Sequence, residues 1–482
     1  MYTPLIIGIE GKKLSRALVS HLKIINPAGI LLLARNIDSP RQLKALISGI
    51  NQSVGRPLLW TIDHEGGNVT RFSRGVTAFP SAQALGRTGN PDLAYAVGRQ
   101  MALELSDMGI LVNFAPVLDL SGSLDNPGIG IRSFGENPGE VSLYGEKFIR
   151  GLEDHQVWAC AKHFPGIGEA RLDPHVSIPK IDISRALIFK RHLPPFLSAF
   201  KAGVHCVMTS HIHYPALDSK LATFSKKIVT GLLKKKLGFK GLVISDDLSM
   251  GAVLKSGLSP AEAAAQACQA GHDLLILSNP DFRLHSQVQE AVRGFSLKEE
   301  IGPILIQRKN RRSQNPDSLH ANRLAAWISQ KAIRVLRSGE KKFPLEKHKG
   351  AVLVLFPKIS EVKSLFTFEG GPEGPERWLK ARLKNHGGVR LIETPVQNKN
   401  LGSISSQIRS AKEILFFCFE ARRFPGQKAV LELLNKIAAE KTTVFLMRGS
   451  TDLTLIDLRS SVIDMAGDRK SQIEAALKVI LK

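Results

Sequence analysis

Short apolar runs alternate with longer amphipathic stretches between residues 5 and 277. The runs are almost continuously apolar, which is typical of strands covered on both faces in a parallel sheet. They predict eight strands, at Leu5–Ile9, Gly29–Ala34, Leu58–Ile62, Val112–Leu118, Trp158–Lys162, Cys206–Ser210, Leu242–Ser245 and Leu274–Leu277.

The amphipathic stretches predict the helices that connect these strands. They cover Leu14–Ile25, Arg41–Asn51, Pro91–Met108, Ser142–His155, Ile188–Ala202, Lys226–Leu237 and Pro260–Ala270. Pro194 and Pro195 predict a kink or break in the fifth of these helices. Eight strands with helical crossovers predict an α/β fold with a (β/α)8 TIM-type barrel, and a doubly wound sheet is the alternative.

Beyond residue 294 the pattern changes. We expect a long helix at Leu319–Leu336, packed on the barrel, and a linker at 338–349, so that the catalytic barrel spans residues 1–337. Residues 350–482 repeat the α/β alternation and predict a smaller α/β domain with a parallel sheet. Its strands are expected at Ala351–Phe356, Val389–Ile392, Ile414–Phe419 and Val444–Met447, and its helices at Gln427–Glu440 and Ser471–Leu481.

Composition narrows the class of protein. The net charge is +23, yet we find no nucleic-acid-binding motif, so a solvated basic linker between 296 and 349 is expected, without a nucleic-acid partner. Four scattered cysteines without a CxxC pair predict neither disulfides nor a zinc site.

No signal peptide or membrane span is recognisable, so we expect a cytoplasmic protein without a membrane partner. No metal or cofactor is expected, and the oligomeric state does not follow from the sequence.

Polar clusters follow five successive strands. A barrel enzyme carries its chemistry at the C-terminal ends of its strands. The clusters are Asp63-His64-Glu65 after the third strand, Asp119 after the fourth, Lys162-His163 at the end of the fifth, His211-Ile212-His213 after the sixth and Asp246-Asp247 after the seventh.

The loop after the fifth strand carries Asp173 and His175, two residues apart. In an extended segment such residues point to the same side, so the carboxylate can orient the imidazole and favour its protonated form. A histidine prepared in this way is suited to general acid/base catalysis.

Taken together, these motifs resemble glycoside hydrolase family 3 and, more narrowly, the bacterial β-N-acetylglucosaminidases of cell-wall recycling. The likeness covers roughly residues 1–340. The motifs that carry it are Ile62–Gly67, Arg132–Gly135, Lys162–Gly166, Asp173–His175 and Ser245–Met250.

The resemblance implies a role for each matching residue. Asp246 matches the nucleophile, which would form a covalent glycosyl-enzyme with retention of configuration. His175 matches the acid/base and Asp173 its dyad partner. The sugar-binding residues of the family are matched by Asp63, Arg71, Arg132, Lys162 and His163.

Asp247 is expected to cap backbone groups instead, because a second carboxylate beside the nucleophile would favour protonation of the attacking group. Two positions depart from the family pattern. Ile167 stands where the family has the histidine of Gly-His-Gly, and Pro174 replaces its serine between the dyad residues. Pro174 is expected to stiffen the loop.

The implied activity is that of a retaining exo-β-N-acetylglucosaminidase. Its partner would be a small oligosaccharide, a peptidoglycan fragment (muropeptide) with a terminal GlcNAc. A β-glucosidase or β-xylosidase is an alternative, and so is an N-acetylglucosaminide phosphorylase, because a neutral histidine base does not repel phosphate.

Two further alternatives are disfavoured. A non-catalytic sugar-binding barrel would not need the nucleophile and the dyad, both of which are matched. A metal-dependent barrel hydrolase would be expected to carry a ligand motif such as HExxH, which is missing. Its ligands would have to come from His163, His205, His211, His213 and Asp246.

Overall fold

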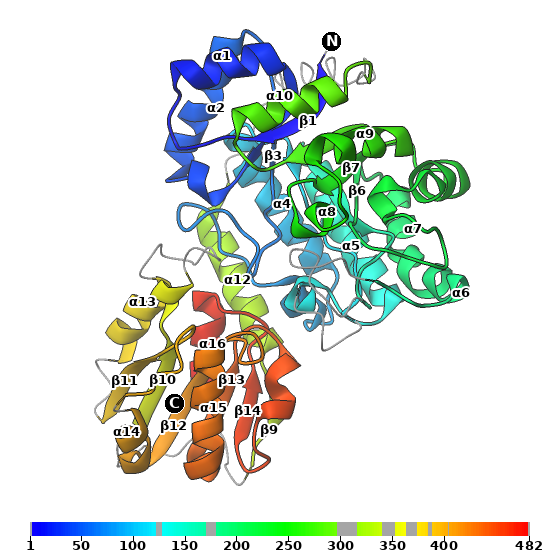
Figure 1. Ribbon diagram of the computed structural model, residues 1–482. Helices are drawn as coiled ribbons and strands as arrows, with labels where there is room; N and C mark the ends of the chain where they lie inside the picture. The colour runs from blue at the N-terminus through cyan, green and yellow to red at the C-terminus, as the bar shows by residue number, and fades with distance from the viewer. Residues whose placement is uncertain are drawn as a thin grey trace. The chain divides into compact units, whose positions relative to one another are not determined.

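The structure, a computed structural model, describes residues 2–121, 128–169, 180–295, 316–339, 352–362, 374–383, 388–402 and 404–480. Eight parallel strands, each paired with the next and β1 paired with β8, close into a barrel (Figure 1). The predicted TIM-type barrel is therefore confirmed, and the doubly wound alternative is wrong. The strands are β1 (Thr3–Gly8), β2 (Pro27–Leu32), β3 (Leu59–Ile62), β4 (Val112–Asn113), β5 (Trp158–Phe164), β6 (Cys206–Thr209), β7 (Leu242–Asp247) and β8 (Leu274–Leu277).

β4 is shorter than the predicted Val112–Leu118. Pro116 has no N–H to donate to a regular ladder. The chain still follows β5, since Pro116 O accepts from Lys162 N and Leu118 N donates to Lys162 O. The Asn113 side chain also takes part in the pairing, because its amide exchanges two hydrogen bonds with the backbone of His64.

Alternate residues of the strands fill the barrel interior. Trp158 and Cys160 of β5, Leu59 of β3 and Ile244 of β7 belong to one buried cluster to which all eight strands contribute. Because side chains alternate along a strand, the residue two positions beyond each of these faces the same interior.

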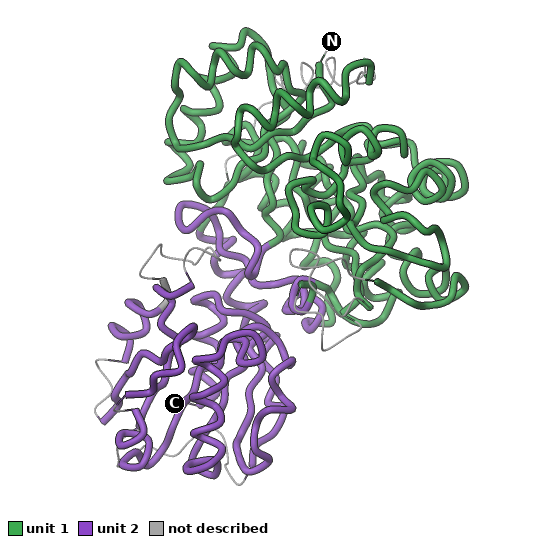
Figure 2. The backbone as a smooth tube through the Cα atoms, in the orientation of Figure 1, with its two compact units in different colours: residues 1–65, 89–129, 133–318 green, residues 66–88, 130–132, 319–482 purple. Residues whose placement is uncertain are grey.

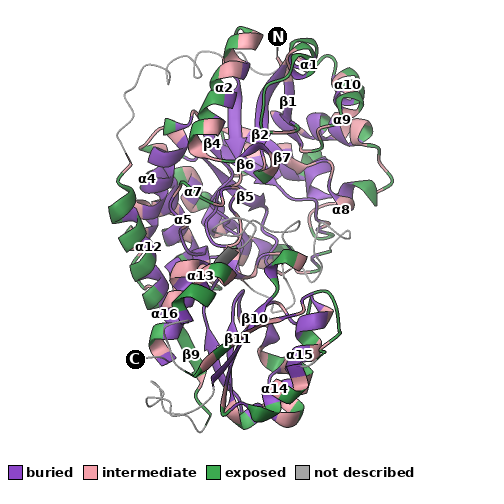
Figure 3. Cartoon of the chain, turned by 90° about the vertical axis from the view of Figure 1, so that its left-hand side faces the viewer, coloured by how far each residue is buried: buried purple, intermediate pink, exposed green. Residues whose placement is uncertain are grey.

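Helices cover the outside of the barrel, with buried inner and exposed outer faces (Figure 3). Ser15, Ser39 and Ser259 begin three of them as N-caps, each accepting a backbone N–H in the first turn. The main helices are α1 (Arg16–Ile25), α2 (Pro40–Val54), α4 (Asp92–Asp107), α5 (Pro138–Glu153), α7 (Leu193–Lys201), η5 (Lys227–Lys236), α9 (Pro260–Ala270) and α10 (Phe282–Ala291).

The break expected at Pro194 and Pro195 is present. A π-helical segment, Ile188–His192, precedes α7, and Pro194 lies in the first turn of α7. There a missing N–H does not interrupt the helical hydrogen bonds.

The chain forms two compact units (Figure 2). The first comprises residues 1–65, 89–129 and 133–318, and the second comprises 66–88, 130–132 and 319–482. Two short segments that leave β3 and β4 thus belong with the C-terminal part of the chain. The predicted domain boundaries at 337 and 350 stay a prediction, and most of the expected linker lies outside the described residues.

The second unit contains a six-stranded sheet in the order β11-β10-β12-β13-β14-β9. It is parallel except for β9, which pairs antiparallel with β14. The expectation of an all-parallel sheet is corrected at this edge. Its strands are β9 (Arg334–Arg337), β10 (Val352–Pro357), β11 (Val389–Thr394), β12 (Glu413–Cys418), β13 (Thr442–Leu446) and β14 (Ser461–Asp464).

The helix expected at Leu319–Leu336 is also corrected. Helix α12 (Ser318–Ala332) ends earlier, and Val335 pairs with Ile463 as part of β9. Tertiary pairing with β14 overrides the helical pattern at these residues.

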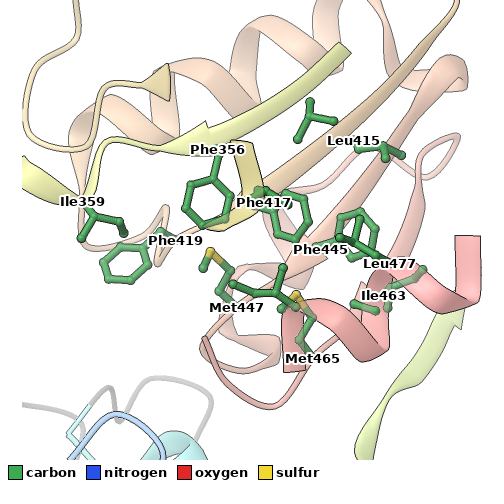
Figure 4. Close-up of a cluster of buried hydrophobic side chains, with 14 of the residues drawn as sticks. Phe356, Ile359, Leu415, Phe417, Phe419, Phe445, Met447, Ile463, Met465 and Leu477 are labelled. Carbon is green, nitrogen blue, oxygen red and sulfur yellow. The ribbon is translucent and has the colours of Figure 1, made fainter. Parts of the chain in front are cut away.

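Both faces of this sheet are covered by helices. Helices α13 (Gly374–Leu383) and α16 (Lys470–Ile480) pack on one face, where Phe356, Phe417, Phe445 and Met447 form a cluster (Figure 4). Helices α14 (Ile404–Ser410) and α15 (Pro425–Ile437) pack on the other face. Burial on both faces explains the continuous apolar character of these strands. In the described part of the chain, no helix is long and apolar enough to cross a membrane.

Candidate active site

Strand alternation places three charged side chains on the interior side of the barrel's C-terminal end. Lys162 lies two residues beyond Cys160, Asp246 two beyond Ile244, and Asp63 four beyond Leu59. The Cys160 thiol lies below them. Its burial raises its pKa, Asp63 and Asp246 raise it further, and Lys162 opposes them. Asp63, Lys162 and Asp246 therefore converge on one region.

The two neighbouring carboxylates at the end of β7 have different surroundings. Asp246 is partly exposed, and its Oδ1 accepts the backbone N–H of Asp247 at 2.8 Å. Asp247 Oδ1 accepts the N–H groups of Ser249 and Ser278, each at 3.0 Å, and the Ser278 hydroxyl donates to Oδ2. Asp247 is thus the backbone cap that the sequence predicts.

Lys162 is held between two carboxylates. Its Nζ lies 2.9 Å from Asp63 Oδ1 and 2.7 Å from Glu65 Oε1. The Glu65 side chain is 5% exposed, whereas that of Asp63 is 18% exposed. The two carboxylates share this cation, and Asp63 is the more accessible of the two.

His163 is oriented by Asp119. Its Nδ1 lies 2.7 Å from Asp119 Oδ2, and its backbone N–H also donates to this carboxylate. Asp119 is fully buried and accepts the Ile167 N–H at 2.7 Å. Since Nδ1 must carry the hydrogen of the bond to a carboxylate, Nε2 of a neutral His163 ring is an acceptor.

The sequence places Glu65 and Asp119 among the strand-end clusters but does not predict their partners. Glu65 lies two residues beyond Asp63, and this spacing is a signal that could have indicated a shared partner. Nothing comparable links Asp119 to His163, which is 44 residues away in the chain.

The root of the loop after β5 is tightly packed. The Tyr214 hydroxyl donates to Gly166 O at 2.5 Å, and Ile167 is buried. A Cβ on Gly168 would lie 2.0 Å from Leu120 O, so that position requires glycine. The dyad residues Asp173 and His175, with Pro174, lie outside the described residues.

His211 supports the backbone beside Asp246. Its Nε2 donates to Asp247 O at 3.0 Å, and its Nδ1 lies 2.9 Å from Thr223 Oγ1. His205, by contrast, pairs with Glu153 and stacks on Trp158. Among the residues that the structure describes, no three His, Cys, Asp or Glu side chains are grouped as a metal site would require.

Arg71 and Arg132 belong to the second unit. Arg71 lies in the segment 66–88, and Arg132 ends a short 3-10 helix, Gly130–Arg132. The structure therefore groups Asp63, Lys162, His163 and Asp246 in one unit and the two arginines in the other.

A closed parallel barrel with carboxylates, a lysine and an oriented histidine at its C-terminal end defines a (β/α)8-barrel enzyme. Residues 5–308 match the family model described as the glycosyl hydrolase family 3 N terminal domain. The chain belongs to glycoside hydrolase family 3 and is a glycoside hydrolase, which confirms the resemblance seen in the motifs.

Named relatives agree with this assignment. The chain is 38% identical over 282 residues to a beta-hexosaminidase of Actinobacillus pleuropneumoniae serotype 3 (strain JL03), covering 57% of this chain and 81% of that protein. It is 34% identical over 344 residues to a beta-hexosaminidase of Alkalilimnicola ehrlichii (strain ATCC BAA-1101 / DSM 17681 / MLHE-1), covering 69% of this chain and 95% of that protein.

Two solved structures differ in how much of the chain they cover. A family 3 beta-N-acetylglucosaminidase from Paenibacillus sp. str. FPU-7 is similar over 98% of this chain and 94% of its own, with a TM-score of 0.85 and 29% identity. NagZ from Neisseria gonorrhoeae is similar over 69% of this chain and 98% of its own, with a TM-score of 0.58 and 29% identity.

Proposed function

We propose that this enzyme is a retaining exo-β-N-acetylglucosaminidase that removes terminal GlcNAc from peptidoglycan fragments. The sugar specificity is supported by relatives named beta-hexosaminidase and by the similar Paenibacillus structure, titled a beta-N-acetylglucosaminidase. Muropeptides as the natural substrate follow from the resemblance to the enzymes of cell-wall recycling.

The observation that carries the proposal is that the neighbouring carboxylates of Asp246 and Asp247 have different hydrogen-bond partners. Asp247 is engaged with Ser249 and Ser278, whereas Asp246 acts electrostatically on Cys160 in the barrel interior and accepts the Asp247 N–H. A partly exposed carboxylate in this position is suited to nucleophilic attack on a sugar.

The reaction would proceed in two displacements. In the first, Asp246 attacks the anomeric carbon, the glycosidic bond breaks, and His175 gives its proton to the departing oxygen. In the second, the neutral His175 takes a proton from water, whose oxygen attacks the anomeric carbon and releases Asp246. Asp173 would hold the imidazole of His175 throughout.

The proposed sugar-binding residues divide by chemistry. Asp63 would accept hydrogen bonds from sugar hydroxyls, and a carboxylate acceptor makes such bonds strong. His163 would present Nε2 as an acceptor, with its ring orientation fixed by Asp119. Arg71 and Arg132 are assigned to sugar binding by their positions in the family motifs.

The test is an assay of the purified enzyme on 4-nitrophenyl N-acetyl-β-glucosaminide beside the β-glucoside and the β-xyloside. EDTA is present throughout, and each reaction runs with and without phosphate. We expect kcat/KM at least about tenfold higher for the N-acetyl sugar, and β-GlcNAc as the first product by NMR. A first product of α configuration, or a preference for the glucoside, would contradict the proposal. A sugar 1-phosphate product would indicate a phosphorylase.

A further inference from the structure

Arg469 lies immediately before α16 and holds a segment that begins 402 residues earlier. Its side chain is buried, its Nε donates to Gly67 O at 2.6 Å, and its Nη2 donates to the same carbonyl. Gln472 supports the arrangement by accepting the Arg469 N–H and donating to Ala466 O. A guanidinium is suited to this because its planar fork fixes direction as well as distance.

Two further contacts hold the same segment, 66–88. Ser81 Oγ donates to Ala466 O at 2.6 Å, and Arg87 Nη2 lies 2.6 Å from Oδ2 of the fully buried Asp464. All three contacts come from residues 464–469, which comprise the last residue of β14 and the connection from β14 to α16. The segment is therefore held near its start, its middle and its end.

Arg71 lies four residues after Gly67, inside the segment held by these contacts. The conformational freedom of a chain around a binding residue must be given up when the ligand binds. Contacts that order the segment beforehand reduce that cost. The Arg469–Gly67 contact is the nearest of the three to Arg71 in the sequence.

We propose that Arg469 is a positioning residue for sugar binding, acting through the Gly67 backbone on Arg71. The inference rests on the proposed function, which assigns Arg71 to the sugar. It gives the C-terminal unit a part in substrate affinity. NagZ from Neisseria gonorrhoeae covers 69% of this chain over 98% of its own length, so about a third of this chain has no counterpart there.

A double-mutant cycle tests the proposal on the full-length enzyme with 4-nitrophenyl N-acetyl-β-glucosaminide. The variants are Arg469→Lys, Arg71→Ala and the double variant. Arg469→Lys keeps the charge but loses the forked geometry. The matched control is Arg337→Lys, because Arg337 also donates from Nε and Nη2 to backbone carbonyls, of Ser460 and Asp457, in the same unit.

We expect Arg469→Lys to raise KM about tenfold with kcat nearly unchanged, and Arg337→Lys to leave both constants unchanged. Adding Arg469→Lys to Arg71→Ala should cause no further rise in KM, because the two residues act as one unit. The melting temperatures of the two lysine variants are compared, so that a general loss of stability is recognised.

Each outcome bears on one claim. If Arg71→Ala is impaired but Arg469→Lys is not, the positioning role is wrong and the proposed function stands. Additive losses in the double variant would also overturn the positioning role, since Arg469 would then act by another route. If Arg71→Ala is fully active, the assignment of Arg71 to the sugar fails, and the inference fails with it.

Discussion

Asp119 and His163 form a buried pair in which one carboxylate binds both the ring and the backbone of the same histidine. The carboxylate also accepts the Ile167 N–H, and so joins the end of β5 to the root of the loop that follows it. The proposed sugar contact of His163 and the root of that loop therefore depend on the same side chain.

The first prediction concerns Asp119→Asn, which preserves shape but removes the charge. One of the three donors would face an amide N–H₂ group, and His163 would lose its fixed tautomer. We expect kcat/KM to fall about 10- to 100-fold, the equivalent of the ~1.5–3 kcal/mol of a hydrogen bond to a charged group. Steady-state kinetics measures this, with the exposed Asp182→Asn as control. Wild-type kinetics in Asp119→Asn would show that the pair is dispensable.

Asp246→Ala should lower kcat by about 10⁴-fold or more, because the covalent route needs this carboxylate. The melting temperature should change little, since the side chain is partly exposed. Asp247→Ala should instead lower the melting temperature clearly and kcat much less. The stability is lost because the Ser249 and Ser278 donors lose their acceptor. Calorimetry and turnover on both variants check this, and an active Asp246→Ala enzyme would refute the assignment of the nucleophile.

His175→Ala should separate substrates by leaving group. A poor leaving group needs a proton from the acid, so its kcat/KM should fall about 10²- to 10⁴-fold. The 4-nitrophenyl glycoside needs little assistance and should lose less than about tenfold in the first displacement. The measurement is a series of aryl glycosides of increasing phenol pKa, and an equal loss across the series would count against an acid role.

Glu65→Gln should weaken sugar binding without stopping the chemistry. With one carboxylate fewer, more of the Lys162 charge acts on Asp63, and Asp63 becomes a poorer acceptor for hydroxyls. We expect KM to rise about tenfold with kcat nearly constant. Asp63→Asn is the matched comparison and should be worse, since Asp63 would contact the sugar directly. Equal effects in both would mean that Glu65 does more than set the charge on Lys162.

His272 should make the fold sensitive to acid. It is buried, donates from Nδ1 to Ala267 O and accepts from Thr209, and burial lowers its pKa to about 3. Between pH 6.5 and 3 the unfolded chain binds a proton here that the folded protein does not, so stability falls as the pH falls through this window. His272→Asn should remove up to about 1.4 kcal/mol per pH unit from that slope. Urea unfolding at several pH values measures it, and an unchanged slope would contradict the prediction.

Much of the barrel follows from pattern alone. Strands such as Leu274–Leu277 are read from continuous apolar runs, and Asp63, Lys162 and Asp246 are found because polar residues end such runs. Strand alternation then predicts which side they face. This works because burial on both faces leaves a signal in every residue of the strand.

Hydrogen-bond partners that follow different strands cannot be found in this way. The pairing of Asp119 with His163 depends on the stagger of β4 against β5, which a one-dimensional pattern does not encode. β9 (Arg334–Arg337) is largely exposed, with arginine at both ends, and β14 (Ser461–Asp464) has a polar residue at both ends. Neither shows the continuous apolar run that marks a barrel strand, and each is stabilised by the other and by the sheet. Likewise, nothing within 66–88 indicates that this segment packs with residues 464–469.

That packing has a consequence for synthesis of the chain. Gly67 leaves the ribosome 402 residues before Arg469 does. At about 5–20 residues per second, this is an interval of roughly 20–80 seconds. During it the segment 66–88 exists without the partners that order it, and once residue 277 has been added this is so even though every strand of the barrel has been made. The segment 66–88 is thus ordered by residues near the end of the chain, which are translated last. A ribosome that stalls soon after residue 318 would leave this segment exposed to a chaperone or protease.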